Sequence, residues 1–358
     1  MKLTIEQQTL AAALKRVIGV VPNRASIPML QNVLITTEGD NVSITATDMD
    51  VEATVKAPAT VHTQGGVTVS AKMLSDTVNK LDKGALVSLD LDDGWLSIKA
   101  GRSRTKAATL PVDDFPHMAS DTYEATIVAP AYEFSDMFDK TAFAASTEET
   151  RYYLNGVYLC TDDGRMTGIA TDGHRLARWR TSITDEFPAV IVPSATVSAL
   201  QLPDAGDVTV SISATKIRFA TDDWCLVSKV VDGTYPDVGR VIPDGKGKAA
   251  RFNSTAMKRA VDKVGVVLDK TDSRVRLEFA PDGITLTGHQ TAAQTEDVVD
   301  AACDDGIDAM AFNYKYLSIA MAKLDGDAIM TMKGAGDPAL IHDDASPDWT
   351  LVVMPMRS

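Results

Sequence analysis

The sequence predicts an α+β protein that contains three similar copies of one structural unit. A hairpin turn made of acidic residues and glycine recurs roughly every 120 residues, a spacing typical of one domain. In each copy a segment with the pattern of a strand followed by a helix comes after this turn. We therefore expect antiparallel strands with two helices per copy. The alternative, three unrelated α+β domains, would not repeat the same order of elements.

The first copy, residues 1–121, sets this order. It opens with a short strand and a helix whose apolar face carries Leu10, Leu14 and Val17 at helical spacing. Two strands then turn at Gly39, which permits a tight hairpin. The remaining elements are a strand–helix segment at 66–81, a hairpin that turns at 92–94 and a connector at 110–116.

The same order recurs in the second copy, residues 122–245, and in the third copy, residues 246–358. Their first helices are marked by Phe134, Met137 and Phe138, and by Met257, Val261 and Val264; their hairpins turn at 163–164 and 282–283; their strand–helix segments are 189–200 and 309–324. The third copy ends in an apolar strand, VVMPMR. We expect this strand to meet the segment 151–176, although the two are far apart in the sequence.

The composition indicates a folded protein from a reducing compartment. Apolar residues make up 45 % of the 358, and the net charge of −14 argues against a simple nucleic-acid binder, which usually has a basic excess. Cys160, Cys225 and Cys303 are too widely spaced for a disulfide framework or a metal site. No apolar leader or membrane-length stretch is present. We expect a cytoplasmic protein with no membrane association, metal or cofactor.

Lysines and arginines gather beside the apolar faces of the predicted helices, while many acidic residues fall in turns and connectors. Any single helix lysine is explained by solvation of a helix surface. The recurrence on one type of element instead predicts a basic surface on an acidic protein. These helix cations are Lys15, Arg16, Lys72, Lys80, Lys140, Lys258, Arg259, Lys263, Lys315 and Lys323.

Four segments make the chain resemble the bacterial sliding clamps, the β subunits of replicative DNA polymerase III. They are RYYLNG (151–156), ATDGHRLA (170–177), VDGTYPDVGRVIP (231–243) and VVMPMR (352–357). Weaker matches are IPMLQNVLI (27–35), TDMDVE (47–52), GRSRT (101–105) and LPVDDFP (110–116), so the resemblance covers the whole length.

The resemblance implies the DNA clamp fold: a ring-shaped homodimer in which three clamp domains per subunit place helices toward the hole and sheets outside. It implies a non-catalytic processivity factor for DNA replication that encircles duplex DNA without regard to sequence. Its partners would be the catalytic subunit of the replicative polymerase, an ATP-dependent clamp loader and other clients with short clamp-binding peptides. Helix cations near phosphates would reconcile DNA binding with the negative net charge.

The resemblance also assigns roles to residues. It implies DNA contacts at Arg24, Lys72, Tyr152 and Tyr153, where tyrosines can stack on bases. Alternatively, the tyrosines are only packed within their segment. The acidic Glu148 and Glu149 before this pair, and Ser194-Ala195 in place of a basic pair, depart from the family pattern and weaken these contacts.

The client-peptide pocket that the resemblance implies combines three separated segments. Gly173 would allow a close backbone approach and the methionines an adaptable wall; the alternative is an ordinary core between domains. The pocket residues are Leu154, Thr171, Gly173, His174, Arg175, Leu176, Pro236, Arg240, Val241, Val352, Met354, Pro355, Met356 and Arg357.

The dimer interface implied by the resemblance pairs two arginines with an acidic strand around an apolar patch. Its residues are Arg102, Arg104, Val266, Val267, Leu268, Glu296 and Asp297. The segment TAAQTEDVVD around Glu296 is less acidic than the family pattern, which predicts a less stable ring or other contacts.

Two other functions compete with this interpretation. Asp172 and His174 on a sharp turn could serve acid–base chemistry, but no nucleophile motif, phosphate loop or metal spacing accompanies them. A DNA-binding regulator that does not encircle DNA would leave a fixed footprint on linear DNA, whereas a clamp slides off free ends.

Overall fold

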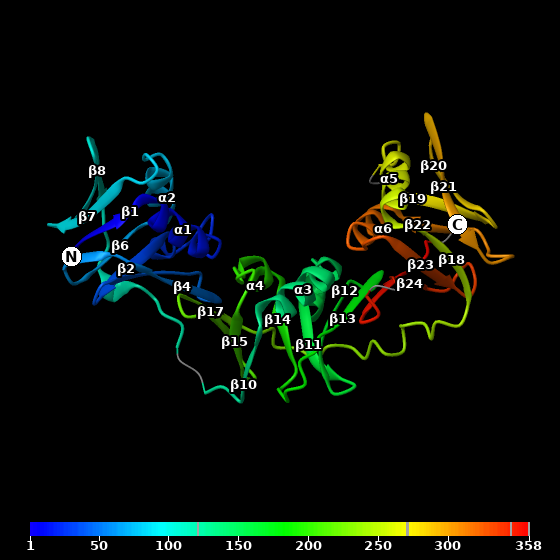
Figure 1. Cartoon of the computed structure of the whole chain (residues 1–358), viewed down its shortest axis with the longest axis horizontal. Helices are drawn as coiled ribbons and strands as arrows, with labels where there is room; N and C mark the ends of the chain where they lie inside the picture. Colours follow the sequence, from blue (N-terminus) through cyan, green and yellow to red (C-terminus); the bar gives the residue numbers. More distant parts are fainter. Residues whose placement is uncertain (120–121, 270–271, 344–345, 357–358) are drawn as a thin grey trace. The chain divides into compact units, whose positions relative to one another are not determined.

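The computed structural model describes residues 1–119, 122–269, 272–343 and 346–356 (Figure 1). The chain divides into two compact units. The first consists of Met1–Tyr132, Glu186–Pro188 and Ala195–Val230; the second consists of Glu133–Asp185, Ala189–Ser194 and the chain from Val231 onward. The middle copy of the repeat therefore contributes strands to both units.

Two antiparallel sheets form the first unit, with strand orders β5-β1-β7-β8-β9 and β10-β15-β16-β17-β4-β3-β2-β6. The five-stranded sheet contains β1 (Lys2–Glu6), β5 (Thr60–Thr63), β7 (Leu86–Asp92), β8 (Trp95–Ala100) and β9 (Ser103–Ala108). The eight-stranded sheet contains β2 (Asn32–Glu38), β3 (Asn41–Thr47), β4 (Val51–Pro58), β6 (Gly66–Ser70), β10 (Ala125–Pro130), β15 (Asp207–Ile212), β16 (Lys216–Ala220) and β17 (Trp224–Lys229).

The helices α1 (Gln7–Ile18) and α2 (Ala71–Asn79) pack together in the first unit. Leu10, Leu14 and Val17 form the buried face of α1, as their spacing predicts. The Gln7 side-chain amide donates to the carbonyl oxygen of Val78 at 2.9 Å and so joins the two helices. Short 3-10 helices η1 (Pro28–Gln31) and η2 (Val112–Asp114) complete this unit.

One antiparallel sheet of twelve strands organises the second unit, in the order β14-β11-β12-β13-β25-β24-β23-β18-β21-β20-β19-β22. Its strands are β11 (Gly156–Asp162), β12 (Arg165–Thr171), β13 (Arg175–Arg180), β14 (Val190–Pro193), β18 (Lys248–Asn253), β19 (Arg274–Ala280), β20 (Gly283–Gln290), β21 (Ala293–Cys303), β22 (Met310–Asn313), β23 (Asp327–Met332), β24 (Ala339–Asp343) and β25 (Trp349–Val353). The sheet thus joins strands of the second and third copies.

The remaining helices are α3 (Ala131–Thr141), α4 (Ser194–Ala199), α5 (Ser254–Gly265) and α6 (Tyr314–Met321), with 3-10 helices η3 (Ala142–Ala144) and η4 (Glu149–Leu154). The described chain therefore has two α-helices per copy, as the repeat predicts. Asn253 and Asn313 cap α5 and α6 by accepting from the backbone N–H groups of Ala256 and Lys315. The helix α3 packs closely on β12, because a Cβ at Gly168 would lie 2.5 Å from Met137.

The predicted hairpin between β11 and β12 is confirmed, with Asp162 paired to Arg165. Asp163 and Gly164 both have positive φ (52° and 72°), as a two-residue turn with the twist of the strands requires. The tyrosine pair precedes this hairpin. Tyr152 and Tyr153 lie in η4, and the first strand of the hairpin begins only at Gly156.

Candidate functional site

The terminal strand meets the segment 151–176, as the sequence predicts. Strand β25 pairs antiparallel with β13, so that Val352 lies opposite Leu176 and Val353 opposite Arg175. One residue further on, the backbone N–H of Met354 donates to the carbonyl oxygen of His174 at 2.8 Å. We call this junction the client seam, defined by β13, β25 and the turn that precedes β13.

Side-chain hydrogen bonds fix the turn before β13. The Thr171 hydroxyl donates to the carbonyl oxygen of Arg175 at 2.6 Å and accepts from the Gly173 N–H at 3.1 Å. Asp172 Oδ1 accepts from the N–H groups of His174 and Arg175 at 2.9 and 3.0 Å. Gly173 has φ +87°, and a Cβ there would lie 3.1 Å from Arg151 Nη1, so glycine suits this position.

The same turn occurs in the first unit, between β3 and β4. The Thr47 hydroxyl donates to the carbonyl oxygen of Val51 at 2.9 Å and accepts from the Met49 N–H at 3.0 Å. Asp48 Oδ1 accepts from the N–H groups of Asp50 and Val51 at 2.9 and 2.7 Å. Met49, at φ +77°, stands where the second copy has glycine. The internal repeat therefore extends to single hydrogen bonds.

The strand that follows this first turn also has an equivalent partner. Strand β4 pairs with β17, and the Lys229 N–H donates to the carbonyl oxygen of Asp50 at 2.9 Å, as Met354 does to His174. In the first unit a salt bridge of 2.8 Å joins the side chains of Lys229 and Asp50. The two copies thus share a backbone and differ in the side chains that they present.

Arg175 stabilises the turn of the client seam from inside. Its guanidinium carbon lies 4.6 Å from the ring centroid of Tyr316 and 5.6 Å from that of Phe143, and its Nε is 3.1 Å from Asp172 Oδ2. Only 11 % of the side chain is exposed. His174 stacks on the same Tyr316 ring, with centroids 6.3 Å apart. Arg175 is therefore a positioning residue, and His174 is more accessible than Arg175.

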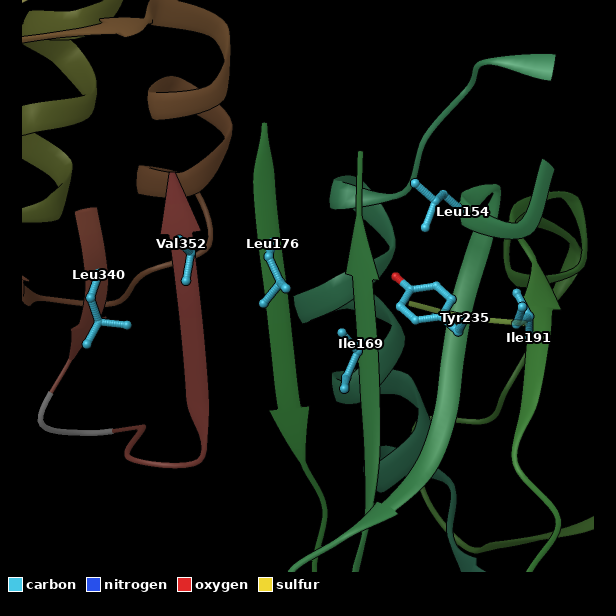
Figure 2. Packing of buried hydrophobic residues seen from close by; sticks show 7 residues of the cluster. All are labelled: Leu154, Ile169, Leu176, Ile191, Tyr235, Leu340 and Val352. Atoms are coloured by element: carbon cyan, nitrogen blue, oxygen red, sulfur yellow. The ribbon is translucent and has the colours of Figure 1, made fainter. Parts of the chain in front are cut away.

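A buried apolar cluster lies beneath the seam. Figure 2 shows side chains from neighbouring strands, with Leu340, Val352, Leu176 and Ile169 in a row. Leu154, Ile191 and Tyr235 complete the cluster. Burial raises the pKa of the Tyr235 hydroxyl, and its ring stacks on that of Tyr158 at 4.6 Å. Three predicted pocket residues, Leu154, Leu176 and Val352, belong to this core.

A pocket of about 310 Å³ opens beside this core, and we call it the client pocket. Three predicted residues line it: Arg240, Val241 and Met354. Val241 is 50 % exposed and Met354 37 % exposed, so both offer apolar surface to a ligand. The other lining residues are Ile242, Pro243, Gly245, Lys246, Thr331, Met332, Lys333, Asp337 and Pro338.

The remaining predicted pocket residues are not among the described residues that line this pocket. Thr171 and Gly173 form the turn, and Pro236 is exposed in the segment after Tyr235. Past Pro355, the Met356 N–H donates to the carbonyl oxygen of Ala311 at 2.7 Å. Arg357 lies outside the described residues.

Several residues of this region were not predicted. Tyr316 and Phe143 enclose Arg175, and Met332 and Pro338 come from β23 and the segment after it. Their positions depend on long-range pairing, so no local pattern marks them. Tyr235 lies inside the segment VDGTYPDVGRVIP, which could have indicated it.

The predicted DNA-contacting residues differ in accessibility. Arg24 and Lys72 are exposed in the first unit. In the second, Tyr152 is 54 % exposed, whereas Tyr153 is partly buried against the core, and their rings meet edge to face at 5.8 Å. Tyr153 Cβ would lie 3.0 Å from a Cβ at Gly233. Tyr152 is thus the ring that is free to meet a partner, and Tyr153 supports it.

Carboxylates neutralise several helix cations. Arg16 pairs with Asp223 at 2.6 Å, and Lys263 pairs with Asp297 at 2.8 Å. The other such pairs are Lys258–Asp262 and Lys323–Asp139, while Lys140 donates to the backbone of Lys323 and lies over the Trp349 ring. Within the described chain, six helix cations have no ion pair: Lys15, Lys72, Lys80, Lys140, Arg259 and Lys315.

The predicted interface residues lie on both units. Arg102 and Arg104 are exposed at the edge of the five-stranded sheet. In the second unit Val266 is 82 % exposed, directly after α5, while Leu268 is buried. Glu296 is exposed, and Asp297 already pairs with Lys263.

Three repeated α+β copies, two helices in each and a seam closed by the terminal strand define the architecture of a DNA sliding clamp. Models of the DNA polymerase III beta subunit match nearly the whole chain: the N-terminal domain at residues 1–119, the central domain at 129–237 and the C-terminal domain at 239–357. The chain belongs to this family.

Relatives and solved structures agree with this assignment. The beta sliding clamp of Caulobacter vibrioides strain NA1000 is 38 % identical, and that of Escherichia coli K12 is 29 % identical; each match covers 100 % of both chains. A sliding clamp from Bartonella birtlesii, solved bound to griselimycin, has a TM-score of 0.95 and 34 % identity with full coverage of both chains. A Caulobacter crescentus clamp has a TM-score of 0.92 and 37 % identity, covering 100 % of this chain and 99 % of its own.

The family fixes the general function. The chain is a DNA sliding clamp of DNA polymerase III, a processivity factor in DNA replication that binds DNA and the polymerase and is not itself catalytic. The Asp172 side chain holds the turn by a hydrogen bond to the His174 N–H, and the His174 ring stacks on Tyr316. These structural contacts explain the positions of both residues. No helix in the described part of the chain is long and apolar enough to cross a membrane.

Proposed function

We propose that clients bind this clamp through a short peptide that occupies the client pocket beside the client seam. The observation that carries the proposal is the placement of Val241 and Met354, two exposed apolar side chains, on a pocket next to a rigid turn. The terminal strand supplies one wall, since Met354 is fixed to His174 through its backbone. The polymerase, the ATP-dependent clamp loader and other clients would compete for this place.

The size of the pocket suits a peptide with a leucine and an aromatic anchor. Burial of two such side chains contributes roughly 3–6 kcal/mol, and each of a few backbone hydrogen bonds adds about 1 kcal/mol. After the ordering of the peptide, an affinity on the order of micromolar results. Such an affinity allows clients to exchange on one clamp.

Removal of residues 354–358 tests this proposal. We expect the truncated protein to stay folded, because β25 ends at Val353 and keeps its pairing with β13 and β24. It should lose binding of a fluorescent polymerase-derived peptide in an anisotropy titration. Lys229→Ala, at the equivalent place in the first unit, is the matched control and should bind normally. Equal affinity of the truncated and intact proteins would place the pocket elsewhere.

The ring is the second part of the proposal. Two copies would close head to tail around duplex DNA, with domains 1–121, 122–245 and 246–358 in each subunit and helices toward the DNA. Val266 supports an interface at the end of α5, because at 82 % it is the most exposed of the large apolar side chains in the described chain. Arg102 and Arg104 would then face Glu296 and Asp297, where Asp297 would be shared with Lys263. A contact between two different surfaces gives a closed ring only when the rotation that relates one copy to the next returns to the first copy.

DNA contact is proposed for Arg24, Lys72, Tyr152 and Tyr153, with the unpaired helix cations as further phosphate contacts. Their accessibility supports the proposal for Arg24, Lys72 and Tyr152. Contacts of this type are independent of sequence and depend on salt. We place the protein in the cytoplasm, with the DNA that it would encircle.

A further inference from the structure

A second pocket lies on the other side of the chain segment that borders the client pocket. This accessory pocket has a volume of about 440 Å³ and shares Ile242, Pro243 and Gly245 with the client pocket. Its other lining residues are Arg178, Asp244, Leu340, His342, Asp343, Pro347, Trp349 and Thr350. The segment 242–245 thus separates two neighbouring hollows of the second unit.

The accessory pocket continues the face of the sheet that carries the seam core. Leu176 pairs with Val352 and Arg178 with Thr350, and residues two apart on a strand point to the same side. Arg178 and Thr350 therefore extend the row begun by Leu176 and Val352. Along this face the apolar core gives way to a cation at the accessory pocket.

Among the residues that the structure describes, Arg178 has one direct carboxylate partner, which it shares with Arg180. Its side chain is 19 % exposed, its Nη2 donates to the Thr350 hydroxyl at 3.0 Å, and its Nη1 lies 3.5 Å from Asp162 Oδ2. The same Asp162 oxygen accepts from Arg180 Nη2 at 2.8 Å and from Arg180 Nε at 3.1 Å. Burial, with the Arg180 charge second, lowers the pKa of the Arg178 guanidinium. Arg178 therefore shares Asp162 with Arg180, whose Nη2 also lies 3.9 Å from Asp163 Oδ2.

The two acids that line the accessory pocket are not placed to neutralise Arg178. Asp244 forms a salt bridge of 2.8 Å with Lys333, which lines the client pocket. Asp343 is buried, with its Oδ1 accepting from the Ser346 N–H and no described partner at Oδ2; its odd spacing from Leu340 puts its side chain on the opposite face of β24. Leu340 and Pro347 give the pocket apolar walls, and an ionic interaction with Arg178 is stronger beside apolar groups than in open water.

We infer that the accessory pocket binds an acidic side chain of the client, next to the apolar anchor that occupies the client pocket. This inference rests on the proposed client pocket. Arg178 supplies the charge for the carboxylate, and Ile242 and Pro243 pack against the methylene groups of an aspartate or glutamate. Clients with an acidic flank thus gain affinity over clients with a neutral flank.

The test uses the intact protein and synthetic peptides with one leucine–phenylalanine anchor. One pair carries three glutamates or three glutamines before the anchor, and a second pair carries them after it. We expect the glutamate form of at least one pair to bind wild-type protein about fivefold more tightly than its glutamine form. Arg178→Met should abolish this preference without changing the affinity for the glutamine peptide.

Arg180→Met is the matched control, because Arg180 contacts the same Asp162 and is not among the described residues that line the pocket. It should keep the preference. Arg178→Lys, which keeps the charge, covers the case in which Arg178→Met does not fold, and it should keep part of the preference. No preference in wild type, or an equal preference after Arg178→Met, overturns the inference. Absence of binding by every peptide would instead refute the client pocket.

Discussion

Met49 and Gly173 occupy the same position in two copies of one turn, and they show what a single residue decides there. Both have positive φ, +77° and +87°, a conformation that residues with a side chain adopt at a cost of about 1 kcal/mol. In the first copy the strain is tolerated because the side chains of Thr47 and Asp48 hold the turn. In the second, glycine also leaves room for Arg151, which lies beside it.

Substitutions at these two positions should differ in their effect on the free energy of unfolding. Gly173→Ala should lower the free energy of unfolding by about 1–2 kcal/mol, because it adds both backbone strain and a contact with Arg151. Met49→Gly should leave stability unchanged or slightly higher, since the strain it removes offsets the flexibility it adds. Thermal unfolding of both variants beside wild type measures the difference. Equal destabilisation by the two substitutions would contradict this explanation.

The half-buried thiol of Cys160 makes the stability of the protein depend on pH above neutrality. Burial, with the Asp162 charge second, raises the pKa of Cys160 from 9.0 to about 11. The folded state therefore keeps a proton that the unfolded state releases, so the contribution is full below pH 9 and is lost as the pH rises toward 11. Denaturant unfolding at pH 8, 9, 10 and 11 should show a smaller decline for Cys160→Ala than for wild type. Identical pH profiles would exclude this role of Cys160.

Elements differ in how far the sequence determines them. The hairpin at Asp163-Gly164 was predictable because two adjacent residues set its turn, and the face of α1 because Leu10, Leu14 and Val17 repeat at helical spacing. The meeting of β13 and β25 was expected from the resemblance of their segments, ATDGHRLA and VVMPMR, to the sliding clamps. The cage of Arg175, the helical turn at Tyr152 and the partners of the helix cations depend on contacts between distant segments, which no local pattern encodes.

Pairing with carboxylates divides the helix cations into two groups with different expected effects on DNA binding. Lys72 has no ion pair in the described chain, whereas Lys258 lies 2.6 Å from Asp262 one helical turn away. Lys72→Ala should weaken DNA binding and lower the salt slope by about one. Lys258→Ala should have a smaller effect, because its charge is already partly neutralised. Anisotropy titrations at several salt concentrations test this, and an unchanged slope for Lys72→Ala would mean that α2 does not face DNA.

At the scale of the whole molecule, the acidic net charge and the DNA-binding role are compatible only if the protein does not depend on tight attraction. A chain of net charge −14 with several neutralised helix cations has weak affinity for phosphates. A closed ring removes this difficulty, since it holds DNA by topology. A weak grip would then favour sliding, and the proposed interface around Val266 would determine how long the ring remains on DNA.

A comparison of circular with linear DNA distinguishes topological retention of the protein from electrostatic attraction to DNA. After loading by an ATP-dependent clamp loader, the protein should co-elute with nicked circular DNA in gel filtration, and cutting the same DNA once should release it, because a ring slides off a free end. Val266→Asp places a charge on the proposed apolar interface, so it should shift the protein toward monomer in sedimentation and lose retention on circles. Val128→Asp, at an exposed valine of β10 that is not among the proposed interface residues, is the control and should behave as wild type. Equal retention of wild-type protein on circular and linear DNA would refute encirclement and favour a DNA-binding protein that does not form a ring.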